Sequence, residues 1–379
     1  MGNKNFISLV LLCFILACSK DDPSNQISNP GTGPPIITPG LIKVIHDRFE
    51  NDEYVLIGSS SNRFIMSFYP EAEDGTPLEF RAIQSKLPLV MHDLEGTQWD
   101  VFGHAIAGPR EGERLKPTQS CMGYWFAFSS HFPGATIYGE GSIDVHIAYD
   151  TVPGWLIPPE HIVEGAQFDR IPSLQNPSSE RYSTRVEVDN PFYVQDHELV
   201  LGVKLGEKVR LYPHKVLNWH EIVNDTLNNM AISLIYAPLT GTGTVWDRVY
   251  EGVETTLGVS GMIYSNNILA FDRYSQSLWS QLRQLCISGH FIGTIPQTYP
   301  VVEMPWGIWK NILSQPDVLS DKTGTSIDYN QFPLTNYLGN HDYILYPIVY
   351  DDTRLPRKER VHGVIVGDKV KVYRFSDFE

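Results

Sequence analysis

Residues 202–212 read GVKLGEKVRLY, and residues 363–373 read GVIVGDKVKVY. Eight of the eleven positions are identical or exchange like for like in charge. From Val203 to Leu211, apolar and polar residues alternate, which is typical of strands with one buried face. Gly206-Glu207 and Gly367-Asp368 stand where a tight turn is needed, and glycine supplies the backbone angles of such a turn. Both segments are therefore predicted to be two-stranded β-hairpins.

A longer and weaker similarity precedes each hairpin. The corresponding pairs are Leu56 and Leu234, Asp93 and Asp272, Trp99 and Trp279, Gly108 and Gly289, Gly112 and Gly293, and Trp125 and Trp306. With Pro133 and Pro316 as a further pair, the offset between the partners drifts only from 178 to 183, which small loop insertions explain. The order is long unit, hairpin, long unit, hairpin, so the sequence predicts a tandem duplication.

Each long unit contains short β-prone runs separated by Gly, Asn and Ser, as in hairpins and meanders. Near the end of each unit, MGYWFAFSSHF and MPWGIWKNIL show helical spacing. The predicted fold class is α+β, mostly antiparallel β with a few helices, in two similar lobes. The first lobe is expected at residues 41–213 and the second at 214–379.

The N-terminus predicts a secreted, lipid-anchored protein. Residues 1–17 contain an apolar run too short for a lasting membrane span, which is typical of a signal peptide. The run ends in Ile-Leu-Ala before Cys18 and resembles the bacterial lipoprotein box, so Cys18 is the predicted lipidation site. Residues 18–40 are expected to be a flexible tether, because Pro, Gly, Ser and Asn dominate them. The acidic residues after Lys20 resemble a tag for lipoproteins of the outer-membrane surface.

Composition narrows the possible partners. The net charge is −15 and no long cluster of Lys or Arg occurs, which disfavours nucleic acid. Only Cys121 and Cys286 remain beside Cys18 and the signal-peptide cysteine, so a disulfide scaffold is not expected. Both are expected to be buried and unpaired, although a bridge between them stays open. The expected partners are the membrane, through the lipid, and a small-molecule, glycan or protein ligand.

Residues 219–225 read WHEIVND and suggest a site at the end of a predicted helix. At an offset of 178, Ile222 to Asp225 correspond to Val44 to Asp47, whereas His220 and Glu221 correspond to Ile42 and Lys43. The fold of the first lobe therefore does not require His-Glu here, which favours a functional role. In a helix, His220 lies beside Asn224 and Glu221 beside Asp225, one turn apart.

A metal site is one interpretation of this polar edge. The stretch lacks the second histidine of HExxH, so a zincin is not expected. A divalent metal held by carboxylates and a histidine stays open, and its candidate ligands are His214, His220, Glu221 and Asp225. A contact with an organic ligand and a plain helix surface are the alternatives.

Other charged residues end predicted strands in the second lobe. These are Arg248, Asp272 and Arg273, which are interpreted as salt-bridge partners or as further ligand contacts. The tryptophans at repeated positions (99, 125, 279 and 306) are expected in the core. Trp155, Trp219 and Trp246 are the candidates for exposed, glycan-stacking platforms.

The second lobe resembles a known family. The segments that carry the resemblance are GAQFDRIPSLQNP, LYPHKVLNWHEIVND, LIYAPLTGTGTVWDR, GVSGMIYSNNILAFDR, SLWSQ and KERVHGV. In this order, from about residue 157 to the C-terminus, they look like the domain-of-unknown-function family 3179. The resemblance implies a bacterial extracytoplasmic protein but no particular reaction. Family members usually carry Cys-Pro-x-Cys where this chain has Ala237-Pro238-Leu239-Thr240, so thiol chemistry is not expected here.

The leading hypothesis is a surface-anchored lipoprotein that binds a ligand in its second lobe, near His220, Glu221 and Asp225. One alternative is a metal-dependent or general-base hydrolase that uses His220 or Glu221. The other is a structural envelope protein without a site of converging polar groups.

Overall fold

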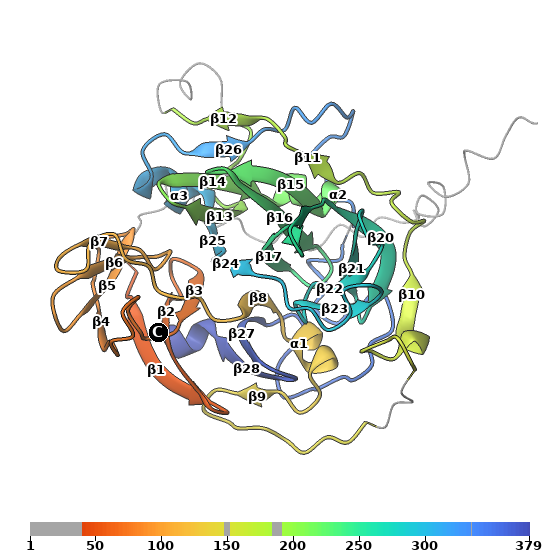
Figure 1. The fold of residues 1–379 in the computed structure, drawn as a ribbon, viewed down its shortest axis with the longest axis horizontal. Coiled ribbons are helices and arrows are strands. Elements are labelled where there is room, and N and C mark those ends of the chain that lie inside the picture. Colours follow the sequence, from red (N-terminus) through yellow and green to blue (C-terminus); the bar gives the residue numbers. More distant parts are fainter. Residues whose placement is uncertain (1–39, 148–151, 184–191, 335) are drawn as a thin grey trace, which may run out of the picture. The chain divides into compact units, whose positions relative to one another are not determined.

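The computed structural model describes residues 40–147, 152–183, 192–334 and 336–379. The predicted signal peptide, Cys18 and all but the last residue of the predicted tether lie outside these residues. Residues from Pro39 onward form one compact unit. Its described part consists mostly of antiparallel strands, with three short α-helices, α1 (Trp125–His131), α2 (His214–His220) and α3 (Trp306–Ile312), which confirms the predicted fold class (Figure 1).

The described part of the first half contains two antiparallel meanders and two further strands. One sheet contains β1 (Lys43–Phe49), β2 (Asp52–Ser59) and β3 (Phe64–Phe68). The next contains β4 (Phe80–Ala82), β5 (Leu89–Asp93), β6 (Gln98–Asp100) and β7 (Ala105–Ala107). Strand β8 (Ser120–Tyr124) then leads into α1, and the short β9 (Thr136–Ile137) follows.

The second half repeats this order of elements. Its first meander contains β15 (Ile222–Leu227), β16 (Met230–Ala237) and β17 (Thr242–Asp247). Its second contains β20 (Leu257–Tyr264), β21 (Asn267–Asp272), β22 (Leu278–Ser280) and β23 (Leu285–Ser288). Strand β25 (Val302–Pro305) leads into α3, and β26 (Asp317–Leu319) follows. Short edge strands extend these sheets: β10 (Ile162–Glu164), β11 (Leu174–Gln175), β12 (Ser179–Arg181) and β24 (Thr298–Tyr299). Strands β18 (Val249–Tyr250) and β19 (Val253–Glu254) form a separate pair, and two 3₁₀ helices, η1 (Pro159–His161) and η2 (Phe375–Phe378), complete the fold.

The two predicted hairpins are confirmed. They are β13 (Leu199–Leu205) with β14 (Lys208–Pro213), and β27 (Arg360–Val366) with β28 (Lys369–Arg374). The first hairpin pairs with β25 and the second with β8, so each joins the strand that precedes a helix. Each also pairs in parallel with the strand after that helix, β14 with β26 and β28 with β9. The sheet of β8 and β27 therefore combines strands from both sides of the predicted lobe boundary at 213.

Local details repeat along with the order of the strands. Asp93 accepts a hydrogen bond from the indole N–H of Trp99, and Asp272 accepts one from Trp279, both at 3.1 Å. Gly108 and Gly289 have φ of 107° and 103°, a region that disfavours side chains, and a Cβ at either would meet backbone within 3 Å. The tandem duplication stays a prediction, and these parallels support it.

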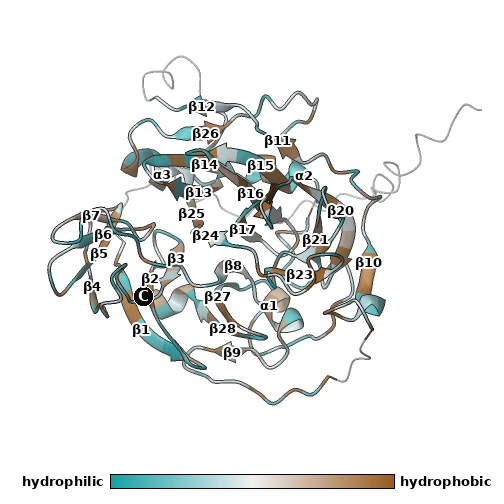
Figure 2. Cartoon of the chain, viewed as in Figure 1, coloured by the Kyte–Doolittle hydropathy of each residue, from teal (hydrophilic) through white to brown (hydrophobic). Residues whose placement is uncertain are grey.

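Buried clusters connect neighbouring sheets into a closed circuit. One cluster joins the sheets of β1–β3, β4–β7 and β13, and a second joins β13 to the sheet of β15–β17. A third links β15–β17 to β20–β23, and another links β1–β3 to the hairpin of β27 and β28. A further cluster closes the circuit by packing Leu282, between β22 and β23, against that hairpin. Figure 2 shows hydrophobic residues recurring along the strands of these sheets. The tryptophans at positions 99, 125, 279 and 306 are fully buried, as expected.

Two expectations about local structure are wrong. The helix expected through WHEIVND ends at His220, because residues 222–227 form β15 and pair with β16. Trp246 is fully buried and offers no exposed platform, whereas Trp155 and Trp219 are half-buried. Cys121 and Cys286 are buried free thiols, as expected, and do not pair.

Candidate functional site

Asp225 has a structural role in β15. Its carboxylate lies 2.7 Å from Nη1 of Arg210 and accepts a hydrogen bond of 2.8 Å from the hydroxyl of Tyr212. The corresponding aspartate in β1, Asp47, lies 2.6 Å both from Nζ of Lys371 and from the hydroxyl of Tyr373. In both halves this aspartate connects a meander to a hairpin through an ion pair and a hydrogen bond. This structural role explains why the aspartate recurs.

Asn224 also connects two sheets. Its side-chain oxygen accepts hydrogen bonds from the Ser233 hydroxyl at 2.6 Å and from the backbone N–H of Leu257 at 2.8 Å. Its amide donates to the Leu257 carbonyl at 2.8 Å. These bonds satisfy the buried amide and hold β15 against β20.

The charged residues at the strand ends do not converge on a site. Arg248 donates to Glu254 at 2.7 Å and to the Thr255 carbonyl at 2.9 Å. Asp272 accepts bonds within its own turn, and Arg273 forms a two-fold ion pair with Asp169 at 2.7 and 2.8 Å. Each of these predicted candidates is explained by a local structural partner.

His220 is fully buried at the end of α2. Its Nδ1 lies 2.7 Å from the carbonyl oxygen of Pro172, which only accepts, so Nδ1 carries the proton. Its Nε2 accepts a hydrogen bond of 2.6 Å from the Tyr329 hydroxyl, and burial lowers the pKa of the ring. With both nitrogens engaged, His220 orients Tyr329 and has no nitrogen left for a metal or for a substrate proton.

The predicted metal ligands are not assembled into a cluster. Within the described ranges, no group of three or more His, Cys, Asp or Glu side chains is placed to hold a metal ion. Asp225 is committed to Arg210 and Tyr212, and His220 to Tyr329, so the candidate set is divided among separate contacts.

Glu221 is the exception among the predicted residues. It follows α2 with φ of 57°, a conformation that costs a non-glycine residue about 1 kcal/mol or more. Its Oε2 is buried without a hydrogen-bond partner, and burial raises the pKa of the carboxyl to about 8. At neutral pH, Glu221 is therefore mostly protonated.

Replacing Glu221 by glutamine is expected to stabilise the protein above pH 8 and to change little near pH 4. A carboxyl whose folded pKa lies above its unfolded value favours the fold below the unfolded pKa, and this contribution is lost as pH rises through about 8. The expected difference is on the order of 2 kcal/mol in the free energy of unfolding. Urea denaturation at both pH values measures it, and equal effects at the two values would contradict this account of Glu221.

A cavity of about 430 Å³ opens beside the first turn of α2. We call it the α2 pocket. Its lining includes cationic side chains and aromatic rings, namely Arg63, His214, Lys215, His341, Lys358, Arg360, Tyr124, Tyr236, Tyr329 and Phe332, with Glu198 as the lining carboxylate. The polar end of α2 predicted from WHEIVND reaches this pocket indirectly, since His220 holds the lining Tyr329.

A buried charge network forms one wall of the α2 pocket. Glu303, which is 5% exposed, lies 2.5 Å from Nη2 of Arg360 and 3.3 Å from Nε2 of His214. The Nδ1 of His214 in turn lies 3.1 Å from the Tyr236 hydroxyl. Burial opposes the charge on Glu303, but Arg360 and His214 lower its pKa to about 2, so the carboxylate is ionised at neutral pH.

Among the residues that the structure describes, Lys358 has no carboxylate partner. Its Nζ donates to the backbone carbonyl oxygens of Tyr337 and Asn340 and lies 3.4 Å from the centre of the Tyr337 ring. The residue is 3% exposed, and burial lowers the pKa of its amine to about 8. At neutral pH the amine is still mostly protonated, so it places an uncompensated positive charge at the pocket wall.

The segment that replaces Cys-Pro-x-Cys lies directly against the α2 pocket. Arg360 donates to the Gly241 carbonyl at 2.5 Å, and Tyr124 donates its backbone N–H to Thr240 at 2.9 Å. The Thr240 hydroxyl belongs to a buried network in which the Asn267 amide donates to it at 2.9 Å. Hydroxyl and amide groups satisfy one another here.

The polar residues of the wall have no polar counterparts in the other half of the chain. Aligned through the repeated glycines, leucines, tyrosines and tryptophans, His214, Tyr236, Glu303 and Arg360 correspond to Phe375, Gly58, Met122 and Leu199. At one of these places, Gly58 is covered by the ring of Phe378, which fills space instead of lining a cavity. The fold therefore does not need these charges.

Sequence reasoning identified only His214 among the four wall residues. Tyr236 lies in a predicted strand, and Lys358 and Arg360 lie in a short basic stretch at the start of β27. A comparison of the repeats at every polar position, extended beyond WHEIVND, would have found Glu303 opposite Met122.

The comparisons with known proteins concern mainly the second half. Residues 168–379 match the model of a family described as protein of unknown function (DUF3179). No curated protein and no solved structure matches the chain. Among the described residues, no helix is long and apolar enough to cross a membrane. With more than half of its length matched by the model, the chain belongs to the DUF3179 family.

Proposed function

We propose that this protein is a surface-anchored bacterial lipoprotein that binds a small anionic ligand in the α2 pocket. The observation that carries the proposal is Lys358, a buried ammonium whose partners within the described ranges are carbonyl oxygens and an aromatic ring. Leaving a buried charge without a counter-charge is costly, and an anion in the pocket would supply the missing partner.

The balance of charge in the pocket supports this reading. The chain as a whole carries −15, yet the pocket is lined by Arg63, Lys215, Lys358 and Arg360 against Glu198 alone. Glu303 behind the wall compensates Arg360, and Glu198 compensates Lys215 at 3.0 Å. The charges of Lys358 and Arg63 remain for a ligand. A cationic cavity in an acidic protein concentrates anions locally.

Size and lining fit a small organic molecule. Ligand cavities usually measure about 300–1,000 Å³ and combine apolar walls with a few converging polar groups. The α2 pocket, at about 430 Å³, offers the rings of Tyr124 and Phe332 beside the charged groups. The ligand expected here is a small organic anion that a cavity of this volume can enclose.

Inorganic sulfate is the simplest probe of this site. We expect it to bind the whole protein measurably in calorimetry, and Lys358→Met to weaken its binding at least tenfold, because the uncompensated charge is removed. The matched control is Lys322→Met, whose ammonium is 80% exposed and pairs with Glu180. Equal sulfate affinity in the Lys358→Met variant and the wild type would refute the proposed site.

The anchoring part of the proposal rests on the lipoprotein box before Cys18. Radiolabelled palmitate is expected to enter the protein in cells and to be lost on Cys18→Ser. Protease treatment of intact cells tests surface exposure, and protection of the protein from that treatment would contradict it.

A hydrolytic role is a second candidate, favoured by one observation. Glu303, His214 and Tyr236 form a carboxylate–imidazole–phenol chain at the pocket wall, with separations of 3.3 and 3.1 Å. Such a chain can move a proton to or from a bound substrate. Turnover of p-nitrophenyl phosphate that is lost on His214→Gln, while sulfate still binds, would favour this role. No turnover by the wild type would remove it.

A further inference from the structure

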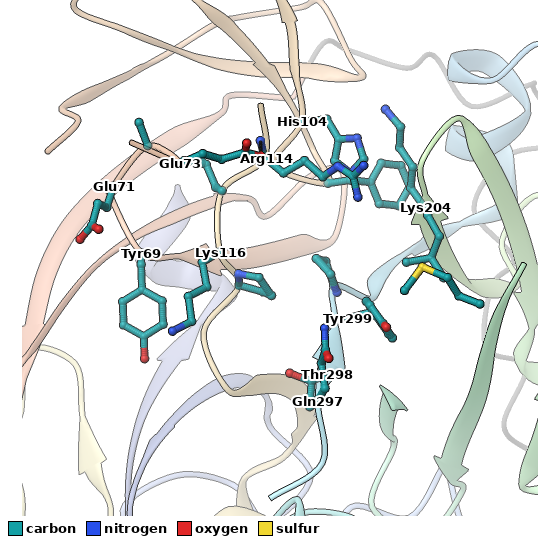
Figure 3. A pocket seen from close by; sticks show the side chains of 17 residues that line it. Tyr69, Glu71, Glu73, His104, Arg114, Lys116, Lys204, Gln297, Thr298 and Tyr299 are labelled. Carbon is teal, nitrogen blue, oxygen red and sulfur yellow. Dashed lines mark hydrogen bonds between the residues drawn. The ribbon is translucent and has the colours of Figure 1, made fainter. Parts of the chain in front are cut away.

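A second cavity lies away from the α2 pocket and measures about 520 Å³. We call it the Arg114 cavity. Its walls come from segments far apart in the chain: residues 69–73 after β3, 102–104 before β7, 114–117 before β8, 204–205 in β13, Met230 in β16, and 297–300 around β24 (Figure 3). Several elements thus meet here, as they commonly do at ligand sites.

Arg114 and Lys116 form the cationic side of this cavity. Their segment is extended, with Arg114 bridged to His104 and Pro117 bridged to Phe68. Both side chains line the cavity and are exposed to solvent, and the buried Leu115 between them lines it as well. Neither cation forms a side-chain ion pair with any carboxylate in the part of the chain that the structure describes. The Lys116 ammonium lies over the Tyr69 ring at 5.2 Å.

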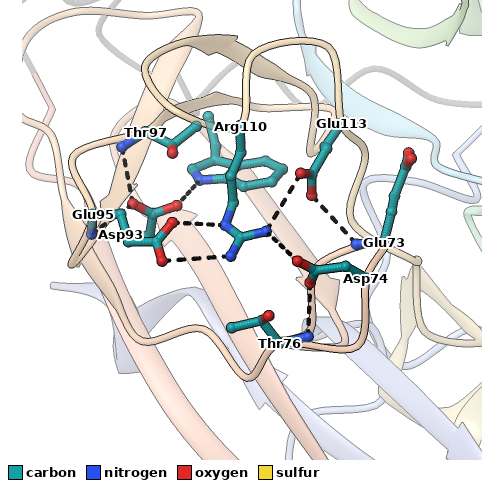
Figure 4. Close-up of polar contacts among 9 residues, drawn as sticks. Glu73, Asp74, Thr76, Asp93, Glu95, Thr97, Arg110 and Glu113 are labelled. Atoms are coloured by element: carbon teal, nitrogen blue, oxygen red, sulfur yellow. Dashed lines mark hydrogen bonds and ion pairs between the residues drawn. The ribbon is translucent and has the colours of Figure 1, made fainter.

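The neighbouring Arg110 is held by three carboxylates and serves as a comparison for Arg114. It lies 2.9 Å from Glu95 and 3.4 Å from both Asp74 and Glu113 (Figure 4). Carboxylates near this loop are therefore available to an arginine, and three of them gather on Arg110. Arg114, four residues later, takes none, although its backbone N–H donates to Glu73 at 3.1 Å. The contrast marks Arg114 as a charge that the fold itself does not neutralise.

The other basic groups on this side of the cavity contribute no free charge, because Lys204 is ion-paired and His104 is neutral. Lys204 pairs with Asp100 at 2.7 Å. Burial, and then the charge of Lys204, lower the pKa of His104 to about 4, so the imidazole is neutral at neutral pH. His104 therefore offers a hydrogen bond and not a charge. The positive charges outside ion pairs at this cavity are those of Arg114 and Lys116, and Glu71 and Glu73 are its lining carboxylates.

The rest of the lining suits a ring that carries hydroxyl groups. Phe102 and Met230 provide apolar surface, and Tyr299 adds an aromatic ring. At the rim, Glu71, Gln297 and Thr298 can accept or donate hydrogen bonds (Figure 3). This combination of apolar surface, exposed carboxylate and amide, with two free cations on one side, matches a molecule with a ring, several hydroxyls and one carboxylate.

We propose that the Arg114 cavity is a second binding site and that it takes an acidic monosaccharide unit. The sugar carboxylate lies between Arg114 and Lys116, the ring lies on Phe102, and the hydroxyls contact Glu71, Gln297 and Thr298. This site is separate from the α2 pocket and does not depend on the ligand proposed there.

Calorimetric titration of the whole protein with D-galacturonate tests the site, with neutral D-galactose as the matched ligand. We expect galacturonate to bind at least tenfold more tightly than galactose, because galactose lacks the carboxylate. The Arg114→Gln/Lys116→Gln double variant should lose at least tenfold in galacturonate affinity and little in galactose affinity. Arg110→Gln removes the same charge from the same loop but from a neutralised position, so it should change galacturonate affinity less than twofold.

Four results would overturn this proposal. The first is no binding of galacturonate, and the second is equal affinity for the two sugars. The third is an unchanged galacturonate affinity in the double variant. Loss of galacturonate binding in Lys358→Met, with the double variant unaffected, would place the sugar in the α2 pocket and also overturn it. Loss of sulfate binding in Lys358→Met together with retained galacturonate binding keeps the two sites distinct.

Discussion

Replacing Arg360 by methionine is expected to lower the free energy of unfolding by about 3–5 kcal/mol. The change leaves the Glu303 carboxylate, 5% exposed, with His214 at 3.3 Å as its remaining neighbour of the pair of basic residues. The cost arises because one member of a buried ion pair is removed while the other stays buried. Urea denaturation at neutral pH, followed by tryptophan fluorescence, measures the change.

Arg48→Met is the control for this substitution. Arg48 lies 3.8 Å from Glu53, and both side chains are more than 60% exposed. Surface ion pairs of this kind contribute about 1 kcal/mol or less. If Arg360→Met proves no more destabilising than Arg48→Met, the buried network does not hold the wall of the α2 pocket.

The same network predicts how acid affects the protein. The folded pKa of Glu303, about 2, lies below the ordinary value of 4.5. A carboxyl with a depressed folded pKa stabilises the fold above its unfolded pKa, and this contribution is lost as pH falls from 4.5 through about 2. In Arg360→Met the part of this acid-dependent loss that arises from Arg360 should be missing.

Replacing Asp225 by alanine is expected to lower the free energy of unfolding by about 3 kcal/mol without affecting sulfate binding. The substitution leaves Arg210 without its carboxylate and the buried Tyr212 hydroxyl without its acceptor. A separation of stability from binding would establish that this residue of WHEIVND serves the fold.

Asp47→Ala provides the matched control in the first half, since Asp47 meets Lys371 and Tyr373 in the same arrangement. Its side chain is 17% exposed, compared with 3% for Asp225, so its loss should cost less. A sulfate affinity that falls tenfold in Asp225→Ala, at unchanged stability, would return Asp225 to the binding site.

The sequence predicts the hairpins and the repeated order of elements because both depend on local patterns. Alternation with a glycine turn specifies two paired strands, and GVKLGEKVRLY and GVIVGDKVKVY contain both signals. The pairing of these hairpins with β25 and β8 is a long-range event that no local pattern encodes. It brings residues 120–124 and 360–366 into one sheet, across the predicted lobe boundary.

The error at WHEIVND has a specific physical origin. His220 and Asn224 have helical spacing, but the chain leaves α2 at Glu221 through φ of 57° and enters β15. Pairing with β16 then determines the conformation of residues 222–227, which places neighbouring side chains on opposite faces. The polar residues expected on one edge of a helix therefore contact different partners.

The α2 pocket escaped prediction for a related reason. His214, Tyr236, Glu303 and Arg360 come from four elements, and only the closed circuit of sheets brings them together. The comparison between repeats finds positions, such as His220 and Glu221, where the two halves of the chain differ in polarity or charge. The contrasts of Met122 with Glu303 and of Leu199 with Arg360 follow from the same alignment, but the sequence does not show that Glu303 and Arg360 meet.

The most direct test of the central claim is the pH dependence of sulfate affinity, because sulfate keeps a constant charge from about pH 6 to about pH 10. If Lys358 holds the anion, affinity is strongest while its amine is protonated, and sulfate raises the pKa of that amine above the value of about 8 in the free protein. Affinity should then fall as pH rises above about 8, the pKa of the free amine, and level off above the raised pKa of the complex. The Lys358→Met variant should lose most of this dependence. A wild-type affinity that is constant over this range, or a dependence that persists in Lys358→Met, would contradict an anion held by Lys358 in the α2 pocket.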